Sequence, residues 1–161
     1  MRETDTHYFF YRHEFGQWTK RDITDMFNLT YNCCEQYMMF HKAMLFEDND
    51  TAQRIMETDD PHEQKKLGRE VADFDIGVWN KYCFMIVWEA NYLKFTQHED
   101  LKNRLIMTQG KCLVEASPVD KVWGVGLAAD DDRILDPKNW KGKNLLGKAL
   151  NSVRDAIIST L

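Results

Sequence analysis

A chain of 161 residues and 19.1 kDa has room for one ordinary domain, which at this length buries roughly two-thirds of the surface that its unfolded chain exposes. Hydrophobic residues make up 43% of the sequence and the formal net charge is -5, which excludes disorder through low hydrophobicity. The acidic balance also argues against broad electrostatic binding of nucleic acid, although it leaves room for a local basic pocket. We therefore expect one domain over residues 1–161.

The lack of targeting signals and the pattern of cysteines predict a cytoplasmic location. No stretch approaches the roughly 18 uninterrupted apolar residues of a transmembrane helix, and the first residues lack the apolar run of a signal peptide. The four cysteines include no Cys-x-x-Cys pair, which is typical of reduced and mostly buried thiols. A cytoplasmic protein that does not bind membranes is expected.

The first half of the chain changes from strand patterns to helix patterns. Aromatic and β-branched residues predict short strands at 8–11 and 27–31. Asn32, followed three residues later by Glu35, resembles an N-cap with its reciprocal acid, and apolar spacing continues a helix to about residue 46. Asp50 is expected to cap a short helix that reaches residue 57. Asp60 and the following proline predict a third helix, which ends near Gly68.

The second half carries the longest helical pattern. Apolar residues at helical spacing predict a helix over about 75–95, with a shorter one around 101–106. Residues 111–116 read as a strand, 122–127 as a glycine-containing strand or turn, and a last helix begins near Asn144. The predicted fold class is α+β, a predominantly helical single domain packed around a small mixed β-sheet.

Two groups of residues could carry chemistry. Glu35 and Lys42 are seven residues apart, close to two helical turns, so they share a face; they either line a pocket, or Glu35 closes a capping box while Lys42 extends past its apolar neighbours. Glu115 shares one side of a short apolar strand with Leu113, which suits an active-site acid or a structural ion pair equally.

Other candidates are weaker. Lys143 and Asn144 precede the last helix, where an anion could bind or a loop could simply be solvated. Trp18 and Trp123 could stack on a base or sugar, although most tryptophans are core residues. The spacing of Gly124 and Gly126 fits a dinucleotide fingerprint only loosely, because aspartates rather than a helix follow it. The histidines lack metal-ligand spacing, so no metal or other cofactor is expected.

Several separate segments together resemble the NADAR family, the YbiA-like N-glycosidases, over roughly residue 15 to the C-terminus. The matching blocks, in chain order, are Asn32–Met39 with Lys42 and Ala43, Asp60 and Pro61 with Leu67–Arg69, Asn91–Phe95, Leu113–Pro118 with Asp120 and Trp123–Leu127, and Gly142–Gly147. Their shared order makes chance agreement very improbable.

The resemblance implies hydrolysis of an N-glycosidic bond between ribose and an exocyclic amine. Substrates known for the family are ADP-ribose attached to guanine, in DNA or as nucleotide, and the phosphoribosylamino-pyrimidine intermediates of riboflavin synthesis. A sugar joined through an exocyclic nitrogen can ring-open to an imine, which a lysine amine can intercept as a Schiff base. ADP-ribosylated guanine is the expected first substrate and the small riboflavin intermediate the second. A non-catalytic reader of ADP-ribose or nucleotides is an alternative of another class.

The resemblance also assigns roles to residues. By position in the family blocks, Lys42 would be the nucleophile, Glu35 would orient it or donate a proton, and Glu115 would handle protons. The substrate-binding residues it implies are Trp18, Arg69, Asp120, Trp123, Gly124, Gly126, Lys143 and Asn144. The chain departs from the usual family pattern at Cys34 and His41, and in the segment 15–22, which leaves its selectivity for the base open.

Overall fold

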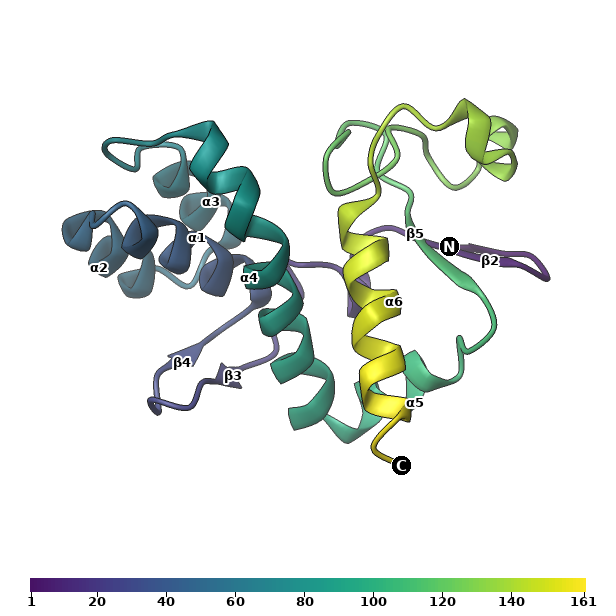
Figure 1. Ribbon diagram of the computed structural model, residues 1–161, viewed down its shortest axis with the longest axis horizontal. Coiled ribbons are helices and arrows are strands. Elements are labelled where there is room, and N and C mark those ends of the chain that lie inside the picture. Colours follow the sequence, from purple (N-terminus) through teal and green to yellow (C-terminus); the bar gives the residue numbers. More distant parts are fainter. The chain divides into compact units, whose positions relative to one another are not determined.

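The computed structural model describes all residues, 1–161, and the chain forms two compact units. Residues 17–97 make up one of them, called here the helical unit; residues 1–16 and 98–161 make up the other, called the sheet unit (Figure 1). Each is described by itself, and the assignment of a single domain over 1–161 stays a prediction. None of the helices has the length and apolar character needed to span a membrane.

The helical unit is built around its first helix. It contains a hairpin of β3 (Ile23–Thr24) and β4 (Thr30–Tyr31), followed by α1 (Cys34–Leu45), α2 (Asn49–Glu57), α3 (Pro61–Gly68) and α4 (Ile76–Gln97). Helix α1 packs against α2, α3 and α4 (Figure 1). A buried cluster joins the hairpin to α1 and α4, and its members are Ile23, Tyr31, Cys34, Tyr37 and Ala90.

Local hydrogen bonds decide where these helices begin. The Asp60 side chain accepts from the His62 N–H at 3.0 Å and caps α3, as predicted. The predicted cap at Asp50 is wrong: Asp48 accepts from the Thr51 N–H and caps α2. Residues 27–29, predicted as strand, form the hairpin turn, because Asp25 Oδ1 accepts from two of their backbone N–H groups.

The predicted capping box at the start of α1 is also wrong. The N-cap residue of α1 is Cys33 rather than Asn32. The side chain that reaches back belongs to Gln36, whose Oε1 accepts from the Asn32 N–H at 2.7 Å. Glu35 therefore does not cap α1. This excludes the capping box as the role of Glu35.

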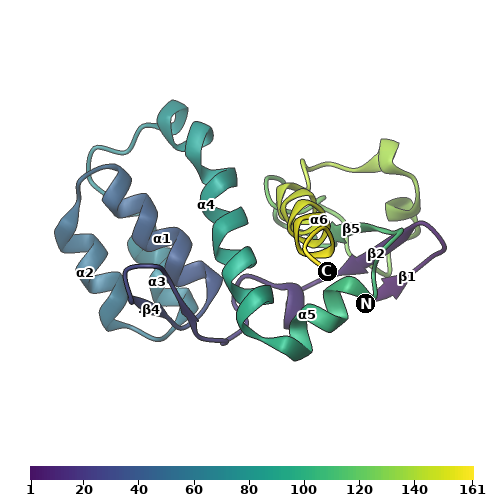
Figure 2. The same ribbon diagram turned by 60° about the horizontal axis from the view of Figure 1, so that its bottom comes forward.

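The sheet unit holds a mixed three-stranded sheet. Strand β2 (His7–Phe10) lies in the centre, antiparallel to β1 (Arg2–Glu3) and parallel to β5 (Cys112–Glu115). Helix α6 (Leu145–Ile158) packs on β5, and α5 (Glu99–Ile106) contacts α6 (Figure 2). The predicted segment 122–127 forms turns, and two 3-10 helices follow it, Asp132–Leu135 and Pro137–Asn139. The α+β prediction with a small mixed sheet is confirmed.

Candidate active site

The amine of Lys42 lies beside two aromatic rings in the helical unit. Its Nζ atom is 4.5 Å from the centroid of the Phe74 ring and 5.6 Å from that of Trp79. Phe74 comes from the loop before α4 and Trp79 from the first turn of α4, whereas Lys42 lies in the last turn of α1. The side chain is half-buried, so the ammonium is partly stripped of water.

Burial and two neighbouring charges decide how readily Lys42 loses its proton. Burial lowers the pKa of the Lys42 amine below its ordinary value of 10.5, the carboxylate of Glu35 raises it, and the guanidinium of Arg69 lowers it. The net direction is downward. Glu35 is 6% exposed. The structure therefore brings Lys42, Glu35 and Arg69 within electrostatic range of one another, and a lysine in such surroundings is better prepared to act as a nucleophile.

Trp18 lies at the surface of the same unit. Its ring meets the His62 ring edge to face, with centroids 4.4 Å apart, and the Lys65 Nζ atom lies 5.8 Å from the Trp18 centroid. Trp18 is only partly buried. The indole is thus held by α3 instead of forming part of the core, which leaves it able to touch a ligand.

The remaining predicted residues belong to the sheet unit. Asn144 and Glu115 meet there through the backbone, because Asn144 Oδ1 accepts from the Glu115 N–H at 2.9 Å. The Asn144 Nδ2 donates to the Leu113 carbonyl at 3.0 Å, and the side chain is 2% exposed. Both ends of this amide are engaged with strand β5. Asn144 therefore positions the strand that carries Glu115, whereas the sequence predicted contact with phosphate or ribose.

Asp120 shapes the turn that presents Trp123. Its Oδ1 atom accepts from the Val122 N–H at 2.9 Å and from the Trp123 N–H at 2.8 Å. A Cβ on Gly124 would lie 2.9 Å from the Ser117 Cβ and 3.0 Å from the Glu115 carbonyl oxygen. The resemblance implies that Gly124 binds substrate, but here the space beside Gly124 is taken by the chain's own atoms.

Gly126 and Lys143 are the other predicted residues in the loops of the sheet unit. Gly126 has a φ of 72°, in the left-handed region that favours glycine. Lys143 has an exposed side chain, and its backbone N–H donates to the Lys121 carbonyl at 3.0 Å. The predicted set is thus divided between the units: Trp18, Glu35, Lys42 and Arg69 lie in the helical unit, and Glu115, Asp120, Trp123, Gly124, Gly126, Lys143 and Asn144 lie in the sheet unit.

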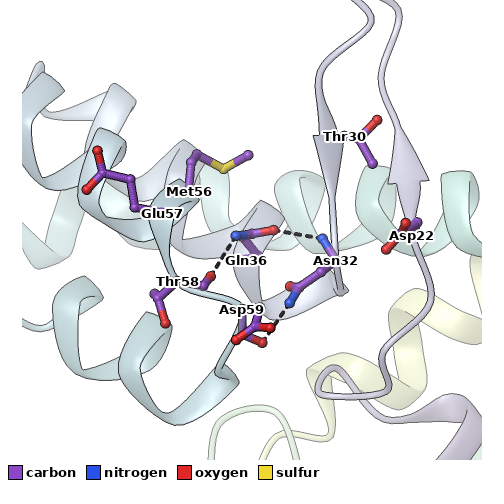
Figure 3. A pocket seen from close by; sticks show the side chains of 8 residues that line it. All are labelled: Asp22, Thr30, Asn32, Gln36, Met56, Glu57, Thr58 and Asp59. Carbon is purple, nitrogen blue, oxygen red and sulfur yellow. Dashed lines mark hydrogen bonds between the residues drawn. The ribbon is translucent and has the colours of Figure 1, made fainter.

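A cavity of about 620 Å³ in the helical unit is lined by none of the predicted residues. Its lining consists of Asp22, Thr30, Asn32, Gln36, Met56, Glu57, Thr58 and Asp59 (Figure 3). The amides are used internally: Gln36 Nε2 donates to the Thr58 carbonyl at 3.1 Å and Asn32 Nδ2 to the Asp59 carbonyl at 2.6 Å. The structure holds no group of three His, Cys, Asp or Glu side chains placed to bind a metal ion.

Sequence reasoning missed the aromatic surroundings of Lys42. Phe74 lies in a loop without periodicity, and nothing in the sequence pairs it with α1. Trp79 falls within the helical pattern predicted over about 75–95, but that pattern does not pair it with Lys42. His62 and Lys65 were not singled out as ligand contacts, although their spacing relative to Arg69 already places the three on one helical face.

Comparison with known proteins gives the family. The sequence pattern of the NADAR domain matches residues 2–158, nearly the whole chain. The chain belongs to the NADAR family. The N-glycosidase R617 of Acanthamoeba polyphaga mimivirus is 42% identical over 165 residues, which cover 95% of this chain and 97% of that protein. The names of such NADAR relatives support a hydrolase of N-glycosyl compounds as the class of activity.

Two further comparisons give a shared fold and a relative of another name. The NMR structure of the E. coli protein YbiA superposes with a TM-score of 0.78 at 24% identity, covering 99% of this chain and 89% of that one, and shows that the fold is shared. The chloroplastic riboflavin biosynthesis protein PYRR of Zea mays is 29% identical over 142 residues. That match covers 82% of this chain but 20% of the maize protein.

Proposed function

We propose that the protein is an N-glycosidase that cleaves the bond between ribose and an exocyclic amine, with Lys42 as its nucleophile. The observation that carries the proposal is the placement of the Lys42 amine: half-buried, 4.5 Å from the Phe74 ring, and within electrostatic range of a buried carboxylate and a guanidinium. A lysine that only covered an apolar surface would extend its ammonium into water instead.

The chemistry follows from the substrate bond. When the ribose ring opens, the bond between the anomeric carbon and the exocyclic nitrogen becomes an imine. The uncharged amine of Lys42 adds to that carbon, and the base departs as its free amine after accepting a proton. This leaves a Schiff base between the sugar and Lys42. Water then adds to the same carbon, the bond to Lys42 breaks, and free sugar and free enzyme are released.

The neighbouring groups supply proton transfer and binding. We assign to Glu35 the donation of a proton to the leaving amine and the acceptance of one from water, because its buried carboxylate acts electrostatically on Lys42. Arg69 holds an anionic group of the substrate and also favours the uncharged amine. The roles that the family resemblance gives to Glu115, Asp120 and Trp123 of the sheet unit stay predictions.

ADP-ribose attached to the exocyclic amine of guanine, in DNA or as nucleotide, is the first substrate we propose. The alternative is a phosphoribosylamino-pyrimidine of riboflavin synthesis, which the similarity to the PYRR protein of Zea mays favours. Both contain ribose on an exocyclic amine, so the Lys42 chemistry serves either. The net charge of -5 favours a small ligand or a short stretch of nucleic acid over a long one.

The test incubates the protein with guanine-ADP-ribosylated DNA, with ADP-ribosylated guanine nucleotide and with the phosphoribosylamino-pyrimidine. Release of sugar is followed by mass spectrometry, with Lys42→Ala as the matched control. Release that requires Lys42 supports the proposal, and the preferred substrate decides between the two classes. Binding of ADP-ribose without release from any substrate would contradict it and favour the non-catalytic reader.

A further inference from the structure

One face of helix α3 carries four basic side chains. His62, Lys65, Lys66 and Arg69, called here the α3 stripe, are spaced three, four and seven residues apart and are all exposed. Of the acidic residues in this segment, Glu70 pairs with Arg54 of α2 at 3.6 Å, and Glu63 is exposed three residues before Lys66. None of the three cations in the stripe forms an ion pair, so their charge faces solvent.

An aromatic ring borders the stripe at its N-terminal end. Trp18 meets His62 at 4.4 Å, and the Lys65 ammonium lies 5.8 Å from the Trp18 ring. Aromatic faces beside cations bind the two parts of a nucleotide, since the base stacks on the ring and the phosphate takes the cation. Trp18, which precedes β3, thus meets His62 and Lys65 of α3 at one place.

The other end of the stripe lies within electrostatic range of Lys42. The charge of Arg69 acts on the amine of Lys42, and α3 packs directly on α1. At the helical rise of 1.5 Å per residue, Lys65 lies about 6 Å and His62 about 10 Å further along α3 than Arg69. A line of side chains, called here the track, therefore runs from Lys42 past Arg69 and Lys65 to Trp18.

We propose that the α3 stripe and Trp18 bind the distal half of a nucleoside-diphosphate sugar, and so select ADP-ribosyl over phosphoribosyl substrates. Arg69 takes the phosphate nearest the ribose, Lys65 the second phosphate, and Trp18 with His62 the distal base. The proposal rests on the proposed function, because the direction of the track is set by Lys42 as the attacking group. A monophosphate would reach Arg69 alone and leave Lys65 and Trp18 without a partner.

The experiment measures binding of ADP-ribose and of ribose 5-phosphate to the full chain by titration calorimetry. Lys65→Ala is expected to weaken ADP-ribose binding about tenfold, the cost of one charge-assisted hydrogen bond. Binding of ribose 5-phosphate should stay within about twofold of wild type by the same measure. Lys81→Ala makes the same change in net charge on an exposed position of α4 and should alter neither.

A second pair of variants tests the ring. Trp18→Leu should weaken ADP-ribose binding by a similar factor, whereas Trp18→Phe, which keeps an aromatic face, should restore most of it. The inference would be overturned if Lys65→Ala weakened the binding of ADP-ribose and ribose 5-phosphate equally, or weakened neither. Absence of turnover by the wild type, with selective loss of ADP-ribose binding in Lys65→Ala, would overturn the proposed function and leave this subsite standing.

Discussion

The Nζ atom of Lys42 lies 4.5 Å from the centroid of the Phe74 ring, while Phe74 itself remains 42% exposed. The ring covers one side of the amine and can still touch a ligand on its own open side. An aromatic face attracts the ammonium, which opposes deprotonation. The pKa of Lys42 nevertheless lies below its ordinary value, because burial outweighs the charge of Glu35 and acts in the same direction as Arg69.

Arg69→Ala is expected to move the pH dependence of turnover. The guanidinium lowers the Lys42 pKa, so its removal raises that pKa and leaves less free amine at neutral pH. The acid limb of kcat/KM should shift to higher pH. Arg69→Lys keeps the charge and should leave the limb in place. A higher KM with an unmoved limb in Arg69→Ala would restrict Arg69 to binding.

Glu35→Gln should shift the acid limb of kcat/KM to lower pH, the opposite direction to Arg69→Ala. The carboxylate raises the Lys42 pKa, so its neutral isostere lowers that pKa and increases the fraction of free amine at neutral pH. If Glu35 also transfers protons, kcat falls by about a hundredfold or more despite the better nucleophile. Steady-state kinetics across pH separate the two effects. An unchanged kcat would show that Glu35 serves only to set the charge of Lys42.

Gly147→Ala should destabilise the protein through a backbone clash in the sheet unit. A Cβ at this position of α6 would overlap the Leu113 carbonyl oxygen and the Asn144 side chain. Because backbone cannot move aside as a flexible side chain does, we expect a loss of about 2 kcal/mol or more in the free energy of unfolding. Lys148→Ala, on the exposed face of α6, should change it by less than about 0.5 kcal/mol. Urea denaturation measures both.

Asp25→Asn should reveal a pH-dependent contribution of the β3–β4 hairpin. Burial alone would raise the Asp25 pKa, but hydrogen bonds from Leu29, Tyr31 and Phe27 lower it below 3.8. The ionised carboxylate therefore stabilises the fold above that value, and this contribution is lost as pH falls through the lowered pKa. The variant should be less stable than wild type at pH 7, by less than about 1 kcal/mol because the group is near solvent. The difference should shrink at pH 2, and a constant difference would exclude the carboxylate charge as its cause.

Local sequence signals predicted the helices well and the site only in part. The long apolar pattern predicted a helix over about 75–95, and α4 spans Ile76–Gln97, because periodicity reports which face is buried. The cap at Asp60 depends only on adjacent residues and was confirmed. The cap at Asn32 was wrong because Gln36, one residue after the expected Glu35, supplies the bond, and spacing cannot decide between two such neighbours.

The contacts that give Lys42 its character are not local. Spacing placed Glu35 and Lys42 on one face of α1, and the carboxylate of Glu35 raises the pKa of the Lys42 amine. Phe74 reaches the same amine from a loop, and Trp18 reaches Lys65 from before the hairpin. Such pairs depend on how α3 and α4 pack on α1, which no single stretch of sequence encodes.

The most direct test of Lys42 as nucleophile is borohydride trapping during turnover, followed by peptide mass spectrometry. Reduction of the Schiff base should leave the sugar attached to the peptide that contains Lys42, and Lys42→Ala should give neither adduct nor product. An adduct that persists in Lys42→Ala, or full turnover by that variant, would contradict the account.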